Sequence, residues 1–486
     1  MPPIAWLPWR AESFARARAA GRPVLLSIVP GWCPHSRMMD RTTYADTGIS
    51  DLVLSRFVPI RVDPNRRPDI GERYGLGGWP TTVFLTPEGR IIGGGTYVET
   101  ARLADVLPRV ANAFSAGRHL IAPQRRYADR IKGGDSPASG DLLQLVFQSF
   151  DATNGGFGGA PKFPHAAPVR LAMGVFRQTG SRHGRDMAVK SLDAIGWGPL
   201  RDERHGGFFS YARGRDWTGP GGGKLLDVNA SLLTLYVEAF ETFGLARYAE
   251  CAESLLRFTQ SWLADPVDGG WSAWQFADPD DDGVRQGDSV VEGRALDVDP
   301  TLYSDWNGRM VSAALRAAGT LDDRSLAEFA INSLEHVLML GYKPGAGMAH
   351  CTKDGEAQVR GLLLDQVEMA AACLDAYEAT GSTPYEMMAQ ELAAYAIRTM
   401  WDEEAGGFWD RIVDPRRDVG LLKEPLKVFT ANCTAVRVLR RLASVPECGD
   451  FARYAERTLA AMSARATAQG PLAAEYLLAL PPQERR

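Results

Sequence analysis

The stretch IVPGWCPHSRMMD, residues 28–40, places Cys33 directly after a strand-like apolar run and before a helix-like run. Dithiol enzymes keep a Cys-x-x-Cys pair at such a junction, but the fourth position here is Ser36. A cysteine that begins a helix is exposed to the helix dipole and to nearby amide N–H groups, which favour the thiolate. Without a second thiol, a disulfide attacked by Cys33 would remain a mixed disulfide. The stretch therefore predicts a monothiol site.

Strand and helix patterns alternate around this site. Short apolar runs rich in β-branched residues predict strands at residues 23–29 and 56–63, and the run 81–98 predicts a hairpin. Helical patterns occupy residues 11–21 and 35–55. We expect a small α/β domain over residues 1–120 and a linker over residues 121–140, where IKGGDSPASG carries Gly, Pro and Ser.

Beyond residue 140 the sequence repeats a helical unit. Long helical runs end in a Gly signal, and a second helix follows almost at once; the stops are Gly180, Gly244, Gly319 and Gly381. Connectors with a Gly-Gly-aromatic or similar pattern join these pairs, as in HGGFFS (205–210) and AGGFWD (405–410). Six pairs over residues 141–486 predict an (α/α)6 toroid, because a pair that cannot bury its own apolar face must stack on neighbours. An open solenoid is the alternative, but no polar capping repeat is evident.

The composition excludes several classes of protein. The 486 residues are 45% hydrophobic and 23% charged, with a formal net charge of −5, so a basic nucleic-acid-binding surface is not expected. No signal peptide and no apolar run of membrane-spanning length is evident. Six cysteines without paired spacing do not indicate a disulfide framework, which favours a reducing cytoplasm. No membrane partner, metal or cofactor is predicted.

Several motifs together resemble one family. They are GWCPHSRMMDRTTY, VDPNRRPDIGERY, GGWPTTVFLTPEGR, GGFGGAPKFP, DWNGRMVSAAL and WDEEAGGFW, in this order. Their order is similar to that of proteins related to spermatogenesis-associated protein 20, which join a thioredoxin-like domain to a six-hairpin toroid. The resemblance implies this architecture over nearly the whole chain. It also implies a toroid like those of N-acylglucosamine 2-epimerases and inverting glycosidases.

This sequence departs from the family pattern at three places. The family's Cys-His-x-Cys-His stretch is represented by Cys33, Pro34, His35, Ser36 and Arg37. Glycines 221–223 replace a His-Phe-Glu run, although Lys224 and Asn229 match the family. A motif with two aspartates retains only Asp365. These departures weaken any direct transfer of catalysis.

The thiol site leaves three interpretations open. Cys33 captures a thiol or client in a mixed disulfide, is a relic in a domain kept for structure or docking, or takes part in glutathione-type chemistry. His35 is a candidate to tune the thiolate, and the family match places Trp79-Pro80 opposite the cysteine in a cis-proline loop. We expect the Trp79–Pro80 bond to be cis.

A second candidate site lies in the toroid. Helices that follow the long connectors start with polar or aromatic residues, whereas helices after the short Gly turns start blandly. If the first kind form the inner ring, their starts meet at one rim and line the main pocket, with these residues: Asn229, Trp306, Asn307, Asp365 and Asn432, and Lys224 near the edge. The alternative is that the Asn and Asp residues merely cap helices. Glu368 lies one turn after Asp365, and His350 and His205 are candidate acid/base residues.

These observations lead to three functional hypotheses. The first is a toroid that binds, and isomerises or epimerises, a carbohydrate-like or other polyhydroxylated small molecule, with the thioredoxin-like domain as an accessory. The second is a thiol-capture protein that acts through Cys33, with the toroid recognising the client. The third is a scaffold without catalysis.

Overall fold

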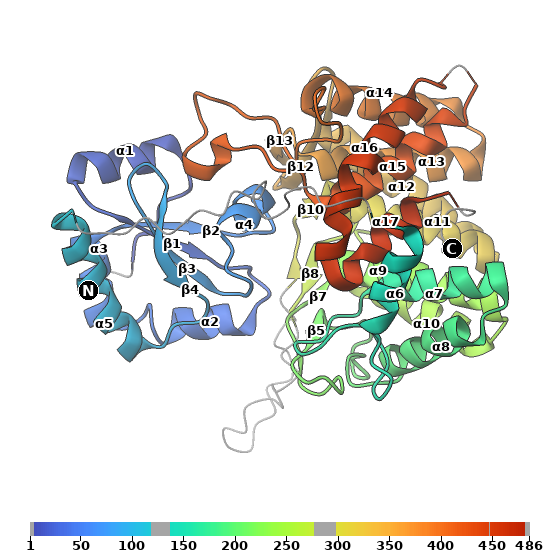
Figure 1. Cartoon of the computed structure of the whole chain (residues 1–486), viewed down its shortest axis with the longest axis horizontal. Coiled ribbons are helices and arrows are strands. Elements are labelled where there is room, and N and C mark those ends of the chain that lie inside the picture. Colours follow the sequence, from blue (N-terminus) through green and yellow to red (C-terminus); the bar gives the residue numbers. More distant parts are fainter. Residues whose placement is uncertain (1–3, 118–136, 277–297, 447, 482–486) are drawn as a thin grey trace. The chain divides into compact units, whose positions relative to one another are not determined.

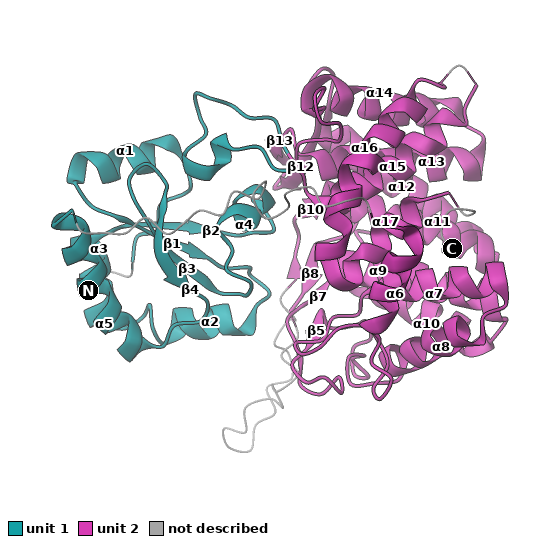
Figure 2. Cartoon of the chain, viewed as in Figure 1, with its two compact units in different colours: residues 1–130, 411–426 teal, residues 131–410, 427–486 magenta. Residues whose placement is uncertain are grey.

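The computed structural model describes residues 4–117, 137–276, 298–446 and 448–481 (Figure 1). The chain forms two compact units, coloured separately in Figure 2: unit 1 comprises residues 1–130 and 411–426, and unit 2 comprises residues 131–410 and 427–486. The predicted linker lies outside the described residues up to residue 136. No helix in the described ranges has the length and apolar content needed to cross a membrane.

Unit 1 has the thioredoxin-like arrangement that the sequence predicts. Its sheet has the order β2-β1-β3-β4, in which β1 runs parallel to β2 and antiparallel to β3. The strands are β1 (Val24–Ile28), β2 (Val58–Val62), β3 (Thr81–Leu85) and β4 (Ile91–Gly95). The helices are α1 (Ala11–Ala20), α2 (Pro34–Arg41), α3 (Thr47–Arg56), α4 (Pro68–Tyr74) and α5 (Thr100–Ser115).

Two apolar clusters cover the two faces of this sheet. On one face Phe14 of α1 and Ile70 of α4 pack with Leu26, and on the other Ile49 of α3 and Leu103 of α5 pack with Leu25. This alternation follows from the period of two residues in a strand. The single helix predicted over residues 35–55 is two helices in the structure. The chain breaks after α2, and the Asp46 carboxylate caps α3 by accepting a hydrogen bond from the amide of Ile49 (2.9 Å).

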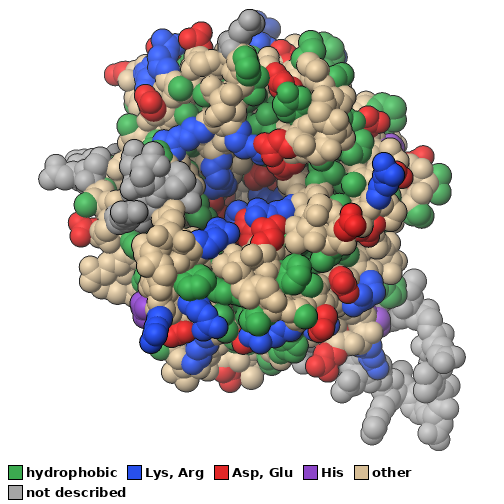
Figure 3. Space-filling view, turned by 90° about the vertical axis from the view of Figure 1, so that its right-hand side faces the viewer, with side chains coloured by type: hydrophobic (Ala, Val, Ile, Leu, Met, Phe, Trp, Pro, Cys, Tyr) green, Lys and Arg blue, Asp and Glu red, His purple; other side chains and the backbone are tan. Residues whose placement is uncertain are grey.

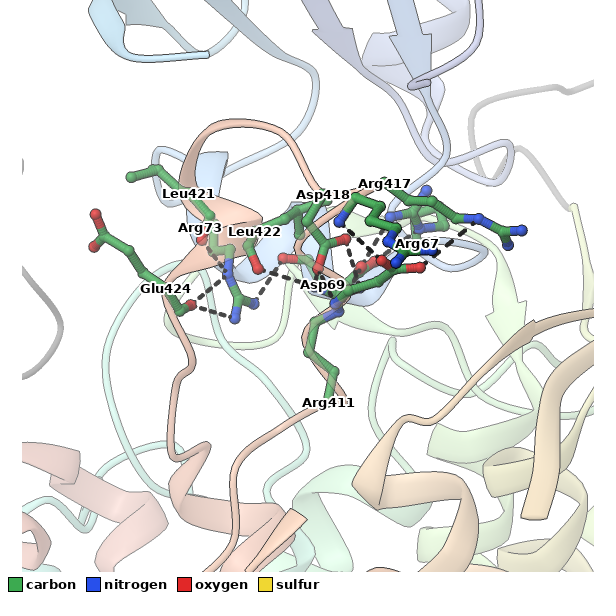
Figure 4. A network of polar contacts seen from close by, with 11 residues as sticks. Arg67, Asp69, Arg73, Arg411, Arg417, Asp418, Leu421, Leu422 and Glu424 are labelled. Carbon is green, nitrogen blue, oxygen red and sulfur yellow. Dashed lines mark hydrogen bonds and ion pairs between the residues drawn. The ribbon is translucent and has the colours of Figure 1, made fainter. Parts of the chain in front are cut away.

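The segment 411–426 completes unit 1, although the sequence assigns it to the toroid (Figure 4). Leu422 is buried in the same apolar cluster as Phe14. The Tyr74 hydroxyl donates to the carbonyl of Gly89 (2.7 Å) and accepts from the amide of Leu421 (2.9 Å). Arg73 donates to the carbonyl of Leu421 (2.9 Å). Backbone contacts of this kind carry little sequence signal, so only tertiary structure shows the attachment.

A buried ion-pair network fixes the start of the same segment. Arg411 donates to both carboxylate oxygens of Asp418 (2.7 and 2.9 Å) and lies 3.4 Å from Asp69, which also pairs with Arg67 (2.8 Å). Gly420 lies so close to Gly89 that a Cβ at residue 420 would be 2.6 Å from the carbonyl oxygen of Gly89. Its φ of +60° also favours glycine. A side chain at this position would therefore displace the segment.

Unit 2 is a closed ring of helix pairs. Its helices are α6 (Ser139–Gln148), α7 (Ala166–Thr179), α8 (Arg182–Gly196), α9 (Leu226–Phe243), α10 (Ala246–Phe258), α11 (Ser304–Leu321), α12 (Arg324–Gly341), α13 (Leu363–Thr380), α14 (Thr383–Met400), α15 (Phe429–Ala443), α16 (Phe451–Ala466) and α17 (Ala474–Ala479). Contacts run from α7 through α9, α11, α13, α15 and α17 back to α7. The toroid is therefore confirmed over the open solenoid, and the helices after the long connectors form its inner ring.

Both ends of unit 2 contribute to the closing helix pair. The first helix, α6, contacts α17 and the 3-10 helix η4 (Thr467–Ala473) that precedes it. Gly180, Gly244 and Gly381 end their helices in the left-handed conformation, as predicted. The prediction for Gly319 is wrong: it lies inside α11, and Asp322 adopts the left-handed conformation instead (φ 55°).

Short strands order the long connectors at the N-terminal ends of the inner helices. They are β5 (Tyr211–Ala212), β6 (Pro220–Gly221), β7 (Lys224–Leu225), β8 (Trp274–Gln275), β9 (Val298–Asp299), β10 (Leu302–Tyr303), β11 (Tyr342–Lys343), β12 (Gly347–Lys353) and β13 (Glu356–Arg360). Strand β12 pairs with β10, β11 and β13 and contacts both α11 and α13. It therefore brings its side chains to the starts of two inner helices.

Candidate functional site

Four inner helices carry a buried side-chain amide at the same position: Asn229, Asn307, Gln366 and Asn432. In Asn307 the amide oxygen accepts from the backbone N–H of Trp271 (2.8 Å), and the nitrogen donates to the carbonyls of Trp271 and Tyr303 (both 3.0 Å). Asn229, Gln366 and Asn432 hold Phe208, Met348 and Phe408 in the same way. These amide clamps join each connector to the helix that follows it.

The amide clamps correct the sequence-based prediction for three residues. The sequence pattern places Asn229, Asn307 and Asn432 in a pocket, but their side chains are fully buried and both amide protons bind backbone carbonyls. A connector without regular structure leaves N–H and C=O groups that must be satisfied once buried. Polar residues at the starts of inner helices supply those partners, which is why the pattern resembles a binding site.

The Lys224 side chain also anchors a connector, whereas the sequence pattern predicts it at the edge of a pocket. Its ammonium group is buried and donates to the carboxylate of Asp202 (2.5 Å) and to the carbonyl of Gly206 (2.8 Å). Lys427 pairs in the same way with Asp402 (2.6 Å). Nδ1 of His205 lies 3.4 Å from Oδ2 of the same Asp202, so His205 joins the polar contacts that anchor this connector.

Three ionisable side chains meet at the starts of α11 and α13. Asp305 lies in the first turn of α11, Asp365 in the first turn of α13, and His350 in the middle of β12. Nδ1 of His350 forms a hydrogen bond with Oδ1 of Asp365 (2.9 Å) and lies 3.9 Å from Oδ1 of Asp305. The exposed fractions of the three residues are 4%, 3% and 0% for Asp305, His350 and Asp365. We name this group the Asp–His–Asp cluster.

Burial changes the proton affinity of both carboxyl groups in the cluster. Removal from water raises the pKa of Asp305 to about 7, helped by the negative charge of Asp365 and opposed by His350. Burial also raises the pKa of Asp365, against the hydrogen bond and charge of His350. Oδ1 of Asp305 and Oδ2 of Asp365 are buried without a hydrogen-bond partner among the described residues. The cluster can therefore hold and release protons near neutral pH.

Aromatic and charged side chains surround the cluster. The Tyr303 ring contacts the rings of Trp306 and His350, at centroid distances of 4.8 and 5.2 Å. One turn further along α11, Arg309 donates to Glu368 of α13 (2.8 Å) and lies 4.0 Å from Asp227 in the first turn of α9. The Arg309 and Asp227 side chains are 29% and 26% exposed, so solvent reaches this layer. Trp306 itself is buried (8% exposed).

The same three residues are close enough to hold a metal ion, with ligand atoms within 4.8 Å of one another. Nδ1 of His350 and Oδ1 of Asp365, 2.9 Å apart, form a direct hydrogen bond. Protonation of Asp305 provides the charge compensation that the buried group needs. We therefore interpret the group as an acid/base cluster.

Sequence reasoning identifies part of this arrangement. It predicts Asp365, His350, Glu368 and Trp306, and the structure brings them to one region around the Asp–His–Asp cluster. It misses Asp305, which directly precedes Trp306 at an inner-helix start. The signal is present in the sequence, because a carboxylate in the first turn of an inner helix points to the same rim as Asp365. Helix capping offers an equally good explanation for it.

The thiol site of unit 1 is almost completely shielded from solvent. Cys33 is 2% exposed at the N-terminus of α2, and its Sγ lies 3.7 Å from the carbonyl oxygen of Trp79. The Trp79–Pro80 bond is cis, as predicted. Ser36 is buried, and its hydroxyl has no hydrogen-bond partner in the described part of the chain. The His35 ring lies 6.2 Å from the ring of Tyr97. Unit 1 supplies no second sulfur from cysteine, since the next cysteine along the sequence is Cys251.

Comparison with known sequences confirms the resemblance that the motifs indicate. Residues 1–131 match the Thioredox_DsbH family, described as a protein of unknown function, DUF255. Spermatogenesis-associated protein 20 of Homo sapiens is 28% identical over 319 residues, which cover 58% of this chain and 40% of that protein. The uncharacterized protein B0495.5 of Caenorhabditis elegans is 31% identical over 264 residues, or 48% of this chain and 36% of that protein. The chain thus spans well under half the length of these relatives.

Solved structures share the fold of unit 2. Cellobiose 2-epimerase from Bacillus thermoamylovorans superposes with a TM-score of 0.53 at 10% identity, covering 66% of this chain and 85% of that chain. D-mannose isomerase superposes with a TM-score of 0.54 at 14% identity, covering 66% and 84%. At these identities the likeness establishes the toroid fold.

Proposed function

We propose that unit 2 binds a carbohydrate-like, polyhydroxylated small molecule and catalyses proton transfer on it, as an isomerase or epimerase does. The Asp–His–Asp cluster carries this proposal. It combines a carboxyl group that exchanges its proton near neutral pH with an imidazole oriented by a second carboxyl group. General acid/base catalysis is most efficient with groups of this kind.

The reaction class follows from the arrangement of the cluster. Isomerisation or epimerisation removes a proton from the carbon beside a carbonyl group and returns a proton to the same or a neighbouring atom. Ionised Asp305 is suited to accept the first proton, and the His350–Asp365 pair is suited to exchange the second with the substrate oxygen. One carboxylate oxygen of Asp305 and one of Asp365 lie within 4.8 Å of each other. An inverting glycosidase needs about 6.5–9.5 Å between its carboxyl groups to admit a water, so hydrolysis of that type fits less well.

Substrate hydroxyl groups have partners beside the cluster. Arg309 and Asp227 are partly exposed and offer hydrogen-bond donors and acceptors, while Glu368 holds the Arg309 guanidinium in place. Trp306, which packs on the buried Tyr303 ring and retains some exposure, offers an aromatic surface of the kind that suits the apolar face of a sugar ring. Cellobiose 2-epimerase and D-mannose isomerase share the toroid fold, and both are named for reactions on sugars. Their likeness to unit 2 supports the substrate class by analogy.

Deuterium exchange tests the proposal whichever product the reaction forms. The full chain is incubated in D2O with glucose, mannose, fructose or cellobiose, and incorporation at the carbon beside the carbonyl is followed by NMR. We expect exchange with at least one sugar, and Asp305→Asn should reduce its rate by about 100-fold or more. Asp186→Asn removes an exposed carboxylate on α8 and should leave the rate unchanged. A full rate in Asp305→Asn would contradict the proposed role of this residue.

Cys33 lies outside this proposal. The sequence of unit 1 has no second cysteine, so a disulfide attacked by Cys33 would remain a mixed disulfide. The position of Cys33 at a helix N-terminus keeps thiol capture as the alternative function. That alternative requires the thiol to become accessible, which the reactivity measurement in the Discussion detects.

A further inference from the structure

A second candidate binding site lies at the opposite ends of the inner helices. A cavity of about 490 Å³ opens near the C-terminal ends of α9 and α15, beside α7 and α17. Five arginines, one glutamate and a short apolar run line it: Arg170, Arg177, Glu238, Arg437, Arg440, Arg441 and residues 478–481. Figure 3 shows a hollow on this face of unit 2 with basic and acidic side chains around it. We name it the arginine cavity.

Ion pairs account for three of the five arginine charges. Arg170 makes two hydrogen bonds to the Glu238 carboxylate (2.8 and 2.6 Å). Arg437 pairs with Glu475 (2.7 Å), and Arg441 pairs with Asp375 (2.6 Å) and with Glu378 (2.9 Å). Arg316, which does not line the cavity, also pairs with the buried Glu238 (2.7 Å). The Glu238 charge is thus shared between two guanidinium groups.

Arg177 and Arg440 form no direct ion pair with a carboxylate among the described residues, although the charge of Arg177 helps to lower the pKa of Glu238. Arg177 donates to the hydroxyl of Thr242 (3.3 Å), and Arg440 donates to the carbonyl of Ala479. The negative end of the α15 dipole offsets part of this charge, but it amounts to about half an elementary charge and Arg441 lies at the same helix end. Four carboxylates, Glu238, Glu475, Asp375 and Glu378, face the five arginines, so the arginine cavity holds an excess of about one positive charge.

We propose that the arginine cavity binds a phosphate monoester of the size of a sugar phosphate. A phosphate monoester carries about −1.5 to −2 charges at neutral pH, so it would neutralise the excess positive charge and accept hydrogen bonds from Arg177 and Arg440. The guanidinium group presents N–H donors in a planar fork that fits phosphate oxygens. The cavity volume lies within the range of small-molecule sites, about 300–1,000 Å³. The apolar wall at residues 478–481 leaves room for the organic part of the ligand.

This site is separate from the Asp–His–Asp cluster. The cluster occupies the first turns of α11 and α13, whereas Arg177 and Arg440 lie in the last turns of α7 and α15. The inference therefore does not depend on the proposed isomerase or epimerase activity. It predicts a binding event that persists when the cluster is disabled.

Isothermal titration calorimetry on the full chain tests the inference. The probes are glucose 6-phosphate, inorganic phosphate, citrate and uncharged glucose, each at low and at high salt. Glucose 6-phosphate and inorganic phosphate should bind saturably and more weakly as salt rises. The variants Arg177→Gln and Arg440→Gln should each weaken binding about tenfold or more, because each removes a charge-assisted hydrogen bond. Arg257→Gln, which removes an exposed arginine of α10, should change it less than about twofold.

The results separate the possible explanations. Unchanged phosphate binding in Asp305→Asn would support a site independent of the cluster. The assignment would be overturned by absence of saturable phosphate binding, or by variants of Arg177 and Arg440 that behave like Arg257→Gln. Tighter binding of citrate than of glucose 6-phosphate would overturn the phosphate class. Arg177 is exposed, so its variant should fold even if Arg440→Gln does not.

Discussion

Replacement of Asp305 by asparagine should make the protein more stable at alkaline pH while slowing proton transfer by about 100-fold or more. The asparagine amide has nearly the shape of the protonated carboxyl group but cannot ionise. In the wild-type protein, burial and the negative charges of Asp365 and Glu368 disfavour ionised Asp305, against the attraction of His350 and Arg309. Ionisation of Asp305 therefore costs folding free energy, and Asp305→Asn removes this cost.

The magnitude follows from the shift in proton affinity. The pKa of Asp305 rises from an ordinary value of 3.8 to about 7, and each pKa unit corresponds to about 1.4 kcal/mol. Between these two values the folded protein retains a proton that the unfolded chain releases, so stability falls as the pH rises. Above about pH 7 both states are ionised and the effect levels off. The full loss in the wild-type protein is on the order of 4 kcal/mol.

Urea denaturation at pH 5 to 8.5, followed by circular dichroism at 222 nm, measures the effect in the helical unit. The stability of Asp305→Asn relative to the wild-type protein should increase with pH and reach a plateau near pH 8. The control Asp186→Asn should follow the wild-type protein at every pH, because this carboxylate is exposed. Parallel curves for wild-type and Asp305→Asn, separated by a constant amount, would show that Asp305 ionises normally. The acid/base interpretation of the cluster would then fail.

Three further predictions concern other parts of the chain. Tyr74→Phe removes the hydroxyl that joins Gly89 to Leu421, so it should destabilise the protein by about 1–3 kcal/mol. Proteolytic cleavage within residues 411–426, followed by mass spectrometry, should become faster. Unchanged cleavage would show that the hydroxyl does not hold this segment. Asn307→Ala should cost about 2–4 kcal/mol in urea denaturation, because the buried amide of Trp271 loses its acceptor, and a loss below about 0.5 kcal/mol would refute the amide clamp. Cys33 should react with a thiol reagent at least about 100-fold more slowly in the native protein than in urea, because it is buried. Oxidised glutathione should give a mixed disulfide without an internal disulfide in residues 1–120. Fast labelling of the native protein would instead favour thiol capture.

The sequence by itself determined the two architectures and the inner and outer helices of the toroid. Strand and helix periods, Gly residues at helix ends and the order of family motifs are local features, and local features can be read before the fold is solved. The cis Trp79–Pro80 bond followed from the motif around it. Polar starts distinguished the inner helices from the outer ones, because only the inner helices must satisfy the buried connectors.

Only the tertiary structure decided which polar groups are available for chemistry. Asn307 and Asp305 lie two residues apart on one helix. The side-chain amide of Asn307 is hydrogen-bonded to the backbone of Trp271, whereas Asp305 lies beside His350, which in turn binds Asp365. A sequence records that a polar side chain is present, but not whether a buried backbone group some 36 residues away satisfies it. The sequence likewise did not show that α6 and α17 form the closing pair of the toroid, or that residues 411–426 belong to unit 1. They depend on long-range packing and backbone hydrogen bonds, which leave no period in the sequence.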